Sequence, residues 1–124
     1  MLPYVLSSLP RLAPQMAFRL GRELQELRKL PADSEIGAEP LDESTCLHWR
    51  GWIKGPEGSP YEGGKFYIDI VIPEGYPFTP PICKFLTKVW HPNVSSVTGV
   101  ICLDILKNEV RIDSLLETIA KAVK

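Results

Sequence analysis

Apolar residues along the chain follow two kinds of spacing, one typical of helices and one typical of strands. A helical spacing begins at Met16 and stops before Pro31, with apolar residues at Ala17, Leu20, Leu24 and Leu27. A second helical spacing lies near the end of the sequence, with apolar residues at Ile112, Leu115, Leu116, Ile119, Ala120 and Val123. Ser114 and Glu117 have the spacing of a capping box, which predicts the first turn of this helix.

Strand-like patterns lie between the two helices. The clearest is an alternation that predicts one strongly apolar face, formed by Phe66, Ile68, Ile70 and Ile72. Residues 46–53 and 82–86 are rich in residue types that favour strands, and Cys83 and Phe85 fall on one side of the second segment. Residues 32–43 are interpreted as a polar linker. Short strands separated by turn sequences predict an antiparallel meander, and the helix at residues 17–30 is expected to cover one of its faces in an α+β fold.

Two segments lack a regular period. Residues 76–81 have the sequence Tyr-Pro-Phe-Thr-Pro-Pro, which predicts a rigid, extended loop because proline restricts its own backbone and that of the preceding residue. Residues 88–106 are irregular but apolar, so they are expected to lie against the core. Their backbone groups then need polar partners, which the side chains in this segment can supply: Asn93, Ser95, Ser96 and Thr98.

Composition excludes several classes of protein. The 124 residues include 14 Lys+Arg against 15 Asp+Glu, and this balance argues against nucleic-acid binding. No apolar run approaches the roughly 20 residues that span a membrane. Three widely spaced cysteines argue against a disulfide scaffold and for a reducing compartment, the cytoplasm and/or the nucleus. No pair of cysteines or histidines has the spacing of a zinc site, so no metal is expected.

The length allows one domain, which we place at residues 16–124. Residues 1–15 contain three prolines and no acidic residue. We expect them to be a disordered or non-native extension, with an organelle presequence as the alternative.

Cys102 is a candidate nucleophile. Cys46 and Cys83 lie within apparent strands, where a free cysteine is usually a small buried hydrophobe. Cys102 instead lies in the irregular segment, after a loop rich in Ser, Thr and Gly, and loops often carry functional residues. No histidine lies beside it in the sequence to act as a base.

Residues 49–107 resemble the core of a ubiquitin-conjugating enzyme (E2). The matching stretches occur in the family's order, and they are Ile53-Lys54-Gly55-Pro56, Ser59-Pro60-Tyr61-Glu62-Gly63-Gly64-Lys65-Phe66, Ile72-Pro73, Tyr76-Pro77-Phe78-Thr79-Pro80-Pro81, Phe85-Leu86-Thr87, His91-Pro92-Asn93 and Gly99-Val100-Ile101-Cys102-Leu103-Asp104-Ile105-Leu106-Lys107. Residues 16–27 are similar to the family's first helix. Residues 95–99 resemble the subgroup whose full-length members carry a C-terminal ubiquitin-associated domain.

The resemblance implies a UBC-like fold, with an N-terminal helix packed on a four-stranded antiparallel meander, an active-site loop and a short crossover helix. It implies that Cys102 accepts ubiquitin as a thioester and that Asn93 steadies the oxyanion or its loop during transfer to lysine. Asp104 would lie near the thioester, and His91 and Pro92 would have structural roles. No cofactor is implied, because the activating enzyme (E1) uses the ATP upstream.

The implied partners are ubiquitin, E1, a ubiquitin ligase (E3) and protein substrates. The first helix, with Arg19, Arg22 and Arg28, matches the helix that faces E1 and E3 in the family. Phe78, in the proline-rich loop, matches an apolar contact for ligases. No nucleic acid or membrane is expected as a partner.

The end of the sequence departs from the family pattern. Val110 stands eight residues after Cys102, where the family has tryptophan. The family's last two helices are expected to be missing, so the domain would be incomplete at its C-terminus. The function therefore has three alternatives: an active E2, a catalytically impaired E2-like binding module or truncated isoform, and a conjugating enzyme for another ubiquitin-like protein.

Overall fold

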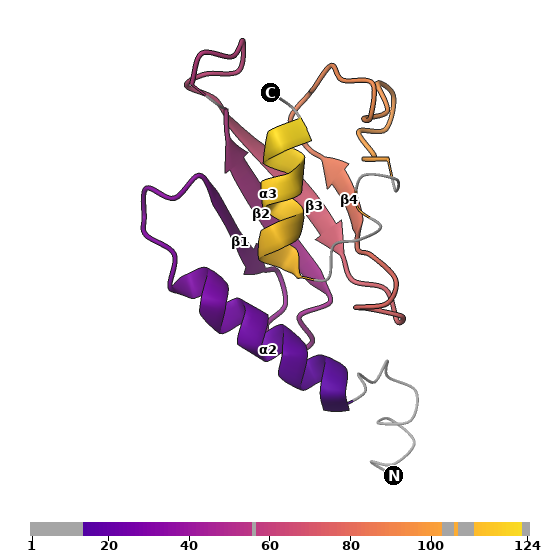
Figure 1. Ribbon diagram of the computed structural model, residues 1–124. Helices are drawn as coiled ribbons and strands as arrows, with labels where there is room; N and C mark the ends of the chain where they lie inside the picture. The colour runs from indigo at the N-terminus through magenta and orange to yellow at the C-terminus, as the bar shows by residue number, and fades with distance from the viewer. Residues whose placement is uncertain (1–13, 56, 103–105, 107–110, 123–124) are drawn as a thin grey trace.

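A computed structural model describes residues 14–55, 57–102, 106 and 111–122. Its elements are the helix α2 (Pro14–Arg28), the strands β1 (Ile36–Pro40), β2 (His48–Lys54), β3 (Lys65–Val71) and β4 (Ile82–Phe85), and the helix α3 (Ile112–Ala122). Figure 1 shows one helical layer against one sheet, with α3 lying across the sheet and α2 crossing near the end of β1.

The sheet is an antiparallel meander in the order β1-β2-β3-β4. Its register places Trp49 opposite Ile70, and Ile70 opposite Cys83, so the inward side chains of neighbouring strands form continuous rows. The inward face is buried and comprises Ile36, Ala38, Trp49, Ile53, Phe66, Ile68, Ile70, Cys83 and Phe85. The predicted α+β fold, the meander and the apolar face of β3 are confirmed.

The interpretation of residues 32–43 as a polar linker was wrong, because β1 lies within them. This strand pairs with β2, and Ile36 and Ala38 point into the core. Only two apolar side chains mark the inward face of β1, and its hydrogen bonds depend on the neighbouring strand. A pattern this short is not distinguishable from a polar loop by alternation alone.

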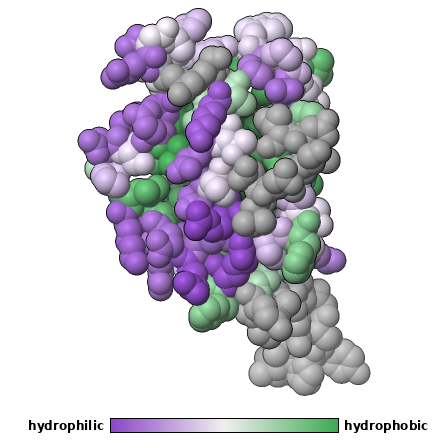
Figure 2. Space-filling view, viewed as in Figure 1, coloured by the Kyte–Doolittle hydropathy of each residue, from purple (hydrophilic) through white to green (hydrophobic). Residues whose placement is uncertain are grey.

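The face of the sheet is covered mainly by α3, which packs on β1 and β2. Its side chains Ile112, Leu115, Leu116 and Ile119 are almost completely buried. A Cβ added to Gly51 would lie 3.1 Å from Leu116 Cδ2, so the absence of a side chain there lets α3 approach the sheet closely. The helix α2 contacts β1 and α3 at one side of this layer. Figure 2 shows the face of the molecule that carries α3, in the same view as Figure 1. The coloured part of this face is mostly polar, with a few apolar residues visible between the polar ones.

The buried side of α2 differs from the predicted stripe. Met16, Leu20 and Leu27 are buried as expected, but Ala17 is exposed. The fourth buried position is Glu23, which is 8% exposed. The apolar spacing did not reveal this position, because a charged side chain is normally assigned to the solvent side.

The predicted capping box of the second helix was also wrong. The helix α3 begins at Ile112, and the Ile112 N–H donates to the Glu23 carboxylate. The Ser114 hydroxyl donates to the Arg111 carbonyl oxygen instead of capping the helix. The cap comes from another helix, so no local sequence pattern marks it.

Gly21 offers a test of how much the stability of α2 contributes to the stability of the fold. It lies inside the helix with no atom within 4 Å of the position of an added Cβ. Gly21→Ala is therefore expected to raise the free energy of unfolding by about 0.5–1 kcal/mol, because alanine loses less backbone entropy on folding. Urea denaturation followed by circular dichroism measures this change.

Gly37→Ala is the matched comparison for that test. A Cβ at Gly37 would lie 2.3 Å from Trp52 Cζ2, so the indole ring would have to move. This substitution is expected to lower the free energy of unfolding by about 1–3 kcal/mol. Equal effects of the two substitutions would contradict the packing described for α2 and β1.

Candidate active site

The irregular segment after β4 is attached to the free edge of that strand. The Ile101 N–H donates to the Cys83 carbonyl oxygen at 2.9 Å, and the Phe85 N–H donates to the Gly99 carbonyl oxygen at 2.8 Å. Val89, Val94 and Ile101 are buried, as expected for an apolar segment that lies against the core. This attachment brings the following residue, Cys102, to the rim of the sheet.

Cys102 is exposed, and its backbone is fixed. Its N–H donates to the Asn93 carbonyl oxygen at 2.7 Å, which joins the two predicted catalytic residues through the main chain. Cys46 and Cys83 are buried, and burial raises the pKa of both thiols, to about 12 for Cys83. Since the thiolate is the nucleophilic form, Cys102 is the cysteine suited to react with a large partner.

The turn that carries Asn93 is held by His91. The His91 Nδ1 atom accepts a hydrogen bond from the Asn93 N–H at 3.1 Å, and the His91 carbonyl oxygen accepts one from the Val94 N–H at 3.1 Å. A ring nitrogen that accepts in this way carries no proton, so His91 is engaged as an acceptor within the turn. Pro92 is exposed between His91 and Asn93. The hydroxyl of Tyr61 donates to the Trp90 carbonyl oxygen at 3.1 Å and holds the start of the turn.

The loop between Asn93 and Cys102 supplies its own polar partners. The Ser95 hydroxyl oxygen accepts from the Val97 and Thr98 N–H groups at 3.3 and 3.1 Å, and the Thr98 hydroxyl accepts from Val100. The loop closes at Gly99, whose φ is +80° and whose N–H donates to the Ser95 carbonyl oxygen. Sequence reasoning identified these polar side chains, but it assigned no role to Gly99 or Tyr61. A glycine directly after a Ser/Thr-rich loop was the available signal for the first.

Two predicted positions cannot be placed in this way. Asp104, the third predicted catalytic residue, and Val110 lie outside the described residues. Among the residues that the structure describes, there is no group of three or more His, Cys, Asp or Glu side chains arranged to hold a metal ion. Within the same residues no helix is long and apolar enough to cross a membrane.

Comparison with known proteins decides the family. The model of the ubiquitin-conjugating enzyme family matches residues 19–123, which include most of α2, the whole sheet, Cys102 and α3. This chain belongs to the ubiquitin-conjugating enzyme family. Human ubiquitin-conjugating enzyme E2 K is 48% identical over 103 residues, which are 82% of this chain and 51% of that protein. Ubiquitin-conjugating enzyme E2 21 of Caenorhabditis elegans is 46% identical over 102 residues, 82% of this chain and 48% of that protein.

Solved structures of ubiquitin-conjugating enzymes share the fold. Human ubiquitin-conjugating enzyme E2 G1 has a TM-score of 0.77 and 31% identity, and the match covers 91% of this chain and 98% of that one. The E2 domain of a Toxoplasma gondii ubiquitin-conjugating enzyme has a TM-score of 0.75 and 46% identity, covering 86% of this chain and 72% of that one. The chain spans about half the length of the curated relatives it matches.

The predicted partner-binding residues of this family member have different surroundings. Phe78 is 95% exposed at the tip of its loop, and Arg22 is exposed on α2 beside the ring of Phe18. Arg19 lies 3.3 Å from the Glu23 carboxylate. Arg28 is paired within its own chain with Glu39 and Glu43, and these carboxylates raise the pKa of its guanidinium group. Phe78 and Arg22 are therefore exposed, whereas Arg28, which is also exposed, is already paired with carboxylates of its own chain.

Proposed function

We propose that this chain is an E2 enzyme that accepts ubiquitin from E1 as a thioester on Cys102 and passes it to a substrate lysine with the help of an E3. The observation that carries this proposal is the exposed Cys102, held through its N–H by the carbonyl oxygen of Asn93 at 2.7 Å. Membership of the family supports it, and the sequence motifs around Cys102 and Asn93 resemble those that carry the family's cysteine and asparagine.

The first step is an exchange of thioesters. The Cys102 thiolate attacks the carbonyl carbon of the ubiquitin C-terminal glycine, which is bound to a cysteine of E1. The new C–S bond forms as the bond to the E1 sulfur breaks, and the E1 thiolate leaves. One thiol replaces another in this exchange, so a dedicated base beside Cys102 is not required.

The second step forms an isopeptide bond. A lysine amine attacks the thioester carbonyl, the C–N bond forms, the C–S bond breaks, and Cys102 leaves as a thiolate while the amine loses a proton to solvent. Charge develops on the carbonyl oxygen, and we assign the Asn93 side-chain amide to stabilise it. His91 holds the turn, and Asp104 would favour the incoming lysine. No cofactor is required by this chain, because ATP is consumed by E1.

Partner docking is assigned to α2 and to the loop that displays Phe78. An aromatic side chain that is almost fully exposed is a common feature of protein-binding surfaces, and the exposed Arg22 adds positive charge on α2. The ubiquitin pathway that such contacts serve operates in the cytoplasm and nucleus, where we place this protein.

A catalytically impaired E2-like module is the second candidate function. The observation that favours it is Val110, which stands where the family has a tryptophan eight residues after its cysteine. Such a module would bind E1, E3 or ubiquitin without completing the transfer.

A pulse-chase experiment separates the two candidates. The chain is charged with E1, ubiquitin and Mg²⁺–ATP, EDTA is then added to chelate the Mg²⁺ and stop further charging, and free lysine is added. An active E2 is expected to show a thiol-sensitive adduct that decays faster as the lysine concentration rises. An adduct whose decay rate does not depend on the lysine concentration would favour the impaired module, and the absence of an adduct would refute the E2 activity.

A further inference from the structure

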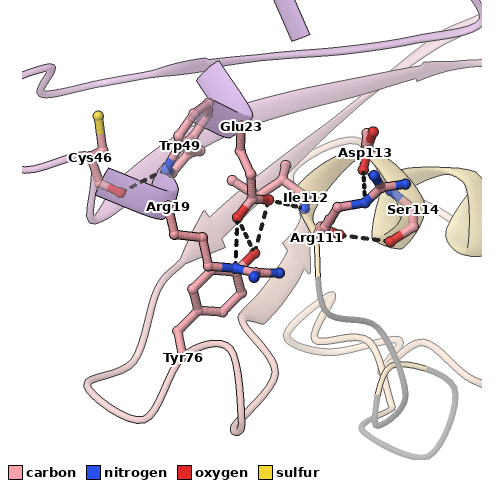
Figure 3. Close-up of polar contacts among 9 residues, drawn as sticks. All are labelled: Arg19, Glu23, Cys46, Trp49, Tyr76, Arg111, Ile112, Asp113 and Ser114. Atoms are coloured by element: carbon pink, nitrogen blue, oxygen red, sulfur yellow. Dashed lines mark hydrogen bonds and ion pairs between the residues drawn. The ribbon is translucent and has the colours of Figure 1, made fainter. Parts of the chain in front are cut away.

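The carboxylate of Glu23 connects three segments that are far apart in the sequence. It lies on α2 and accepts a hydrogen bond from the Ile112 N–H at 2.6 Å, at the first turn of α3. It also accepts from the Tyr76 hydroxyl, at 2.9 Å to Oε1 and 2.8 Å to Oε2, from the loop between β3 and β4. The Arg19 Nε atom lies 3.3 Å from Oε2. Figure 3 shows this carboxylate between Tyr76 and the start of α3, with Arg19 beside it.

Tyr76 is the base of the turn that presents Phe78. The Tyr76 side chain is 4% exposed, whereas Phe78, two residues later, is 95% exposed. Between them the chain reverses tightly, because the Phe78 and Thr79 N–H groups both donate to the Gly75 carbonyl oxygen, at 2.8 and 2.9 Å. A group that fixes Tyr76 therefore fixes the position and direction of Phe78.

We propose that Glu23 is a positioning residue that locks the Phe78 loop and the first turn of α3 to α2, so that the docking surface is presented as one rigid unit. This inference rests on the proposed function in one respect, the assignment of Phe78 to partner docking. The lock itself is independent of that assignment. The hydrogen-bonding needs of both partners are met: the N-terminal N–H group of α3 gains an acceptor, and the buried carboxylate of Glu23 gains several donors.

The electrostatics of the lock give it a pH dependence. Burial raises the pKa of Glu23, opposed by the Ile112 N–H, the Tyr76 hydroxyl and Arg19, and Asp113 adds to the rise. Arg111, which pairs with Asp113 at 3.2 Å, and Glu26 border the same cavity. A carboxyl group whose pKa is higher in the folded state contributes stability below its ordinary pKa and loses it as pH rises through the raised value. The stability of the wild type relative to Glu23→Gln is therefore expected to fall as pH rises from the ordinary pKa of a glutamate through the raised pKa of Glu23.

Nuclear magnetic resonance tests the lock without any enzyme activity. The Ile112 amide proton is expected to shift with pH in the wild type, with a midpoint above the ordinary pKa of a glutamate, and not to follow that titration in Glu23→Gln. The matched control is Glu26→Gln, one turn along α2, where the exposed carboxylate contacts Lys29. This control should titrate like the wild type. A titration that persists in Glu23→Gln would assign it to Asp113 and overturn the lock.

Tyr76→Phe tests the positioning role. This variant removes the hydroxyl that joins the loop to Glu23 and leaves the bond to Ile112. We expect the E3 concentration needed for half-maximal transfer to rise about tenfold, with charging by E1 and E3-independent discharge to lysine unchanged. Tyr67→Phe is the matched control, because that tyrosine lies partly exposed on β3 and its hydroxyl has no hydrogen-bond partner among the described residues.

The two parts of this experiment fail separately. An unchanged response to E3 in Tyr76→Phe, or an equal loss of E3-independent discharge, would overturn the positioning role. A wild-type chain that E1 does not charge would refute the proposed function, while the titration of the Ile112 amide would still decide whether Glu23 forms the lock.

Discussion

Replacement of Asn93 by alanine is expected to slow the transfer of ubiquitin from Cys102 to lysine by about 10²–10³-fold. The lost group is the side-chain amide that we assign to the oxyanion. The main-chain carbonyl oxygen of Asn93, which accepts the Cys102 N–H, is retained in the variant. Charging by E1 should therefore persist, and single-turnover discharge to lysine measures the loss.

The control for this experiment is Ser96→Ala in the same loop. Ser96 is exposed, and its side chain has no hydrogen-bond partner within the described part of the chain. Its variant is expected to charge and discharge like the wild type. If Asn93→Ala lost charging and discharge to the same extent, the side chain would act by holding the turn; if neither changed, its role at the oxyanion would be refuted.

Gly99→Ala is expected to lower the free energy of unfolding by roughly 3 kcal/mol and to release Cys102 from its position. The φ of Gly99 is +80°, a conformation that costs alanine about 1–2 kcal/mol. A Cβ there would also lie 2.5 Å from the Phe85 carbonyl oxygen, a main-chain atom of β4 that cannot move alone. To relieve this contact, residues 99–101 would have to move away from β4, the strand that supports Cys102.

Gly63→Ala has the first cause alone, so its difference from Gly99→Ala measures the contribution of the contact with Phe85. Gly63 has a φ of +83°, but no atom lies within 4 Å of its added Cβ. Its loss of stability is expected to be about 1 kcal/mol, with charging preserved. Denaturant unfolding and a charging gel measure both variants. Equal losses in the two would show that the contact with Phe85 adds nothing, contrary to the attachment of the active-site segment to β4.

The elements that sequence predicted correctly are those whose pattern is both long and local. The alternation of β3 and the helical spacing of α3 each repeat over several residues, so the buried face follows from the pattern itself. The strand β1 was missed because Ile36 and Ala38 are too few to establish an alternation. The cap of α3 was assigned wrongly because its acceptor, Glu23, lies 89 residues earlier in the chain.

The candidate site likewise has some features that the sequence predicted and others that it did not. The exposure of Cys102 agrees with the distinction drawn between it and the two cysteines expected in strands, both of which are buried: Cys83 lies in β4, whereas Cys46 lies just before β2 and not in a strand as expected. The contact between Asn93 and Cys102 could not be predicted from the hydrophobic spacing or from composition. We expected the two residues to act together only because the sequence resembles the ubiquitin-conjugating enzyme family. The ion pairs of Arg28 with Glu39 and Glu43 join separate elements, so a basic residue on a helix gave no indication of them.

The measurement that tests the central claim most directly is the intact mass of the chain after incubation with E1, ubiquitin and ATP. The account predicts a gain of one ubiquitin less one water, reversed by a thiol reductant. Cys102→Ser should show the same gain as an oxyester that resists the reductant, Cys102→Ala should show none, and Cys46→Ser should behave like the wild type. A folded wild-type chain without this gain, or an adduct that persists in Cys102→Ala, would contradict the assignment of Cys102 as the ubiquitin acceptor.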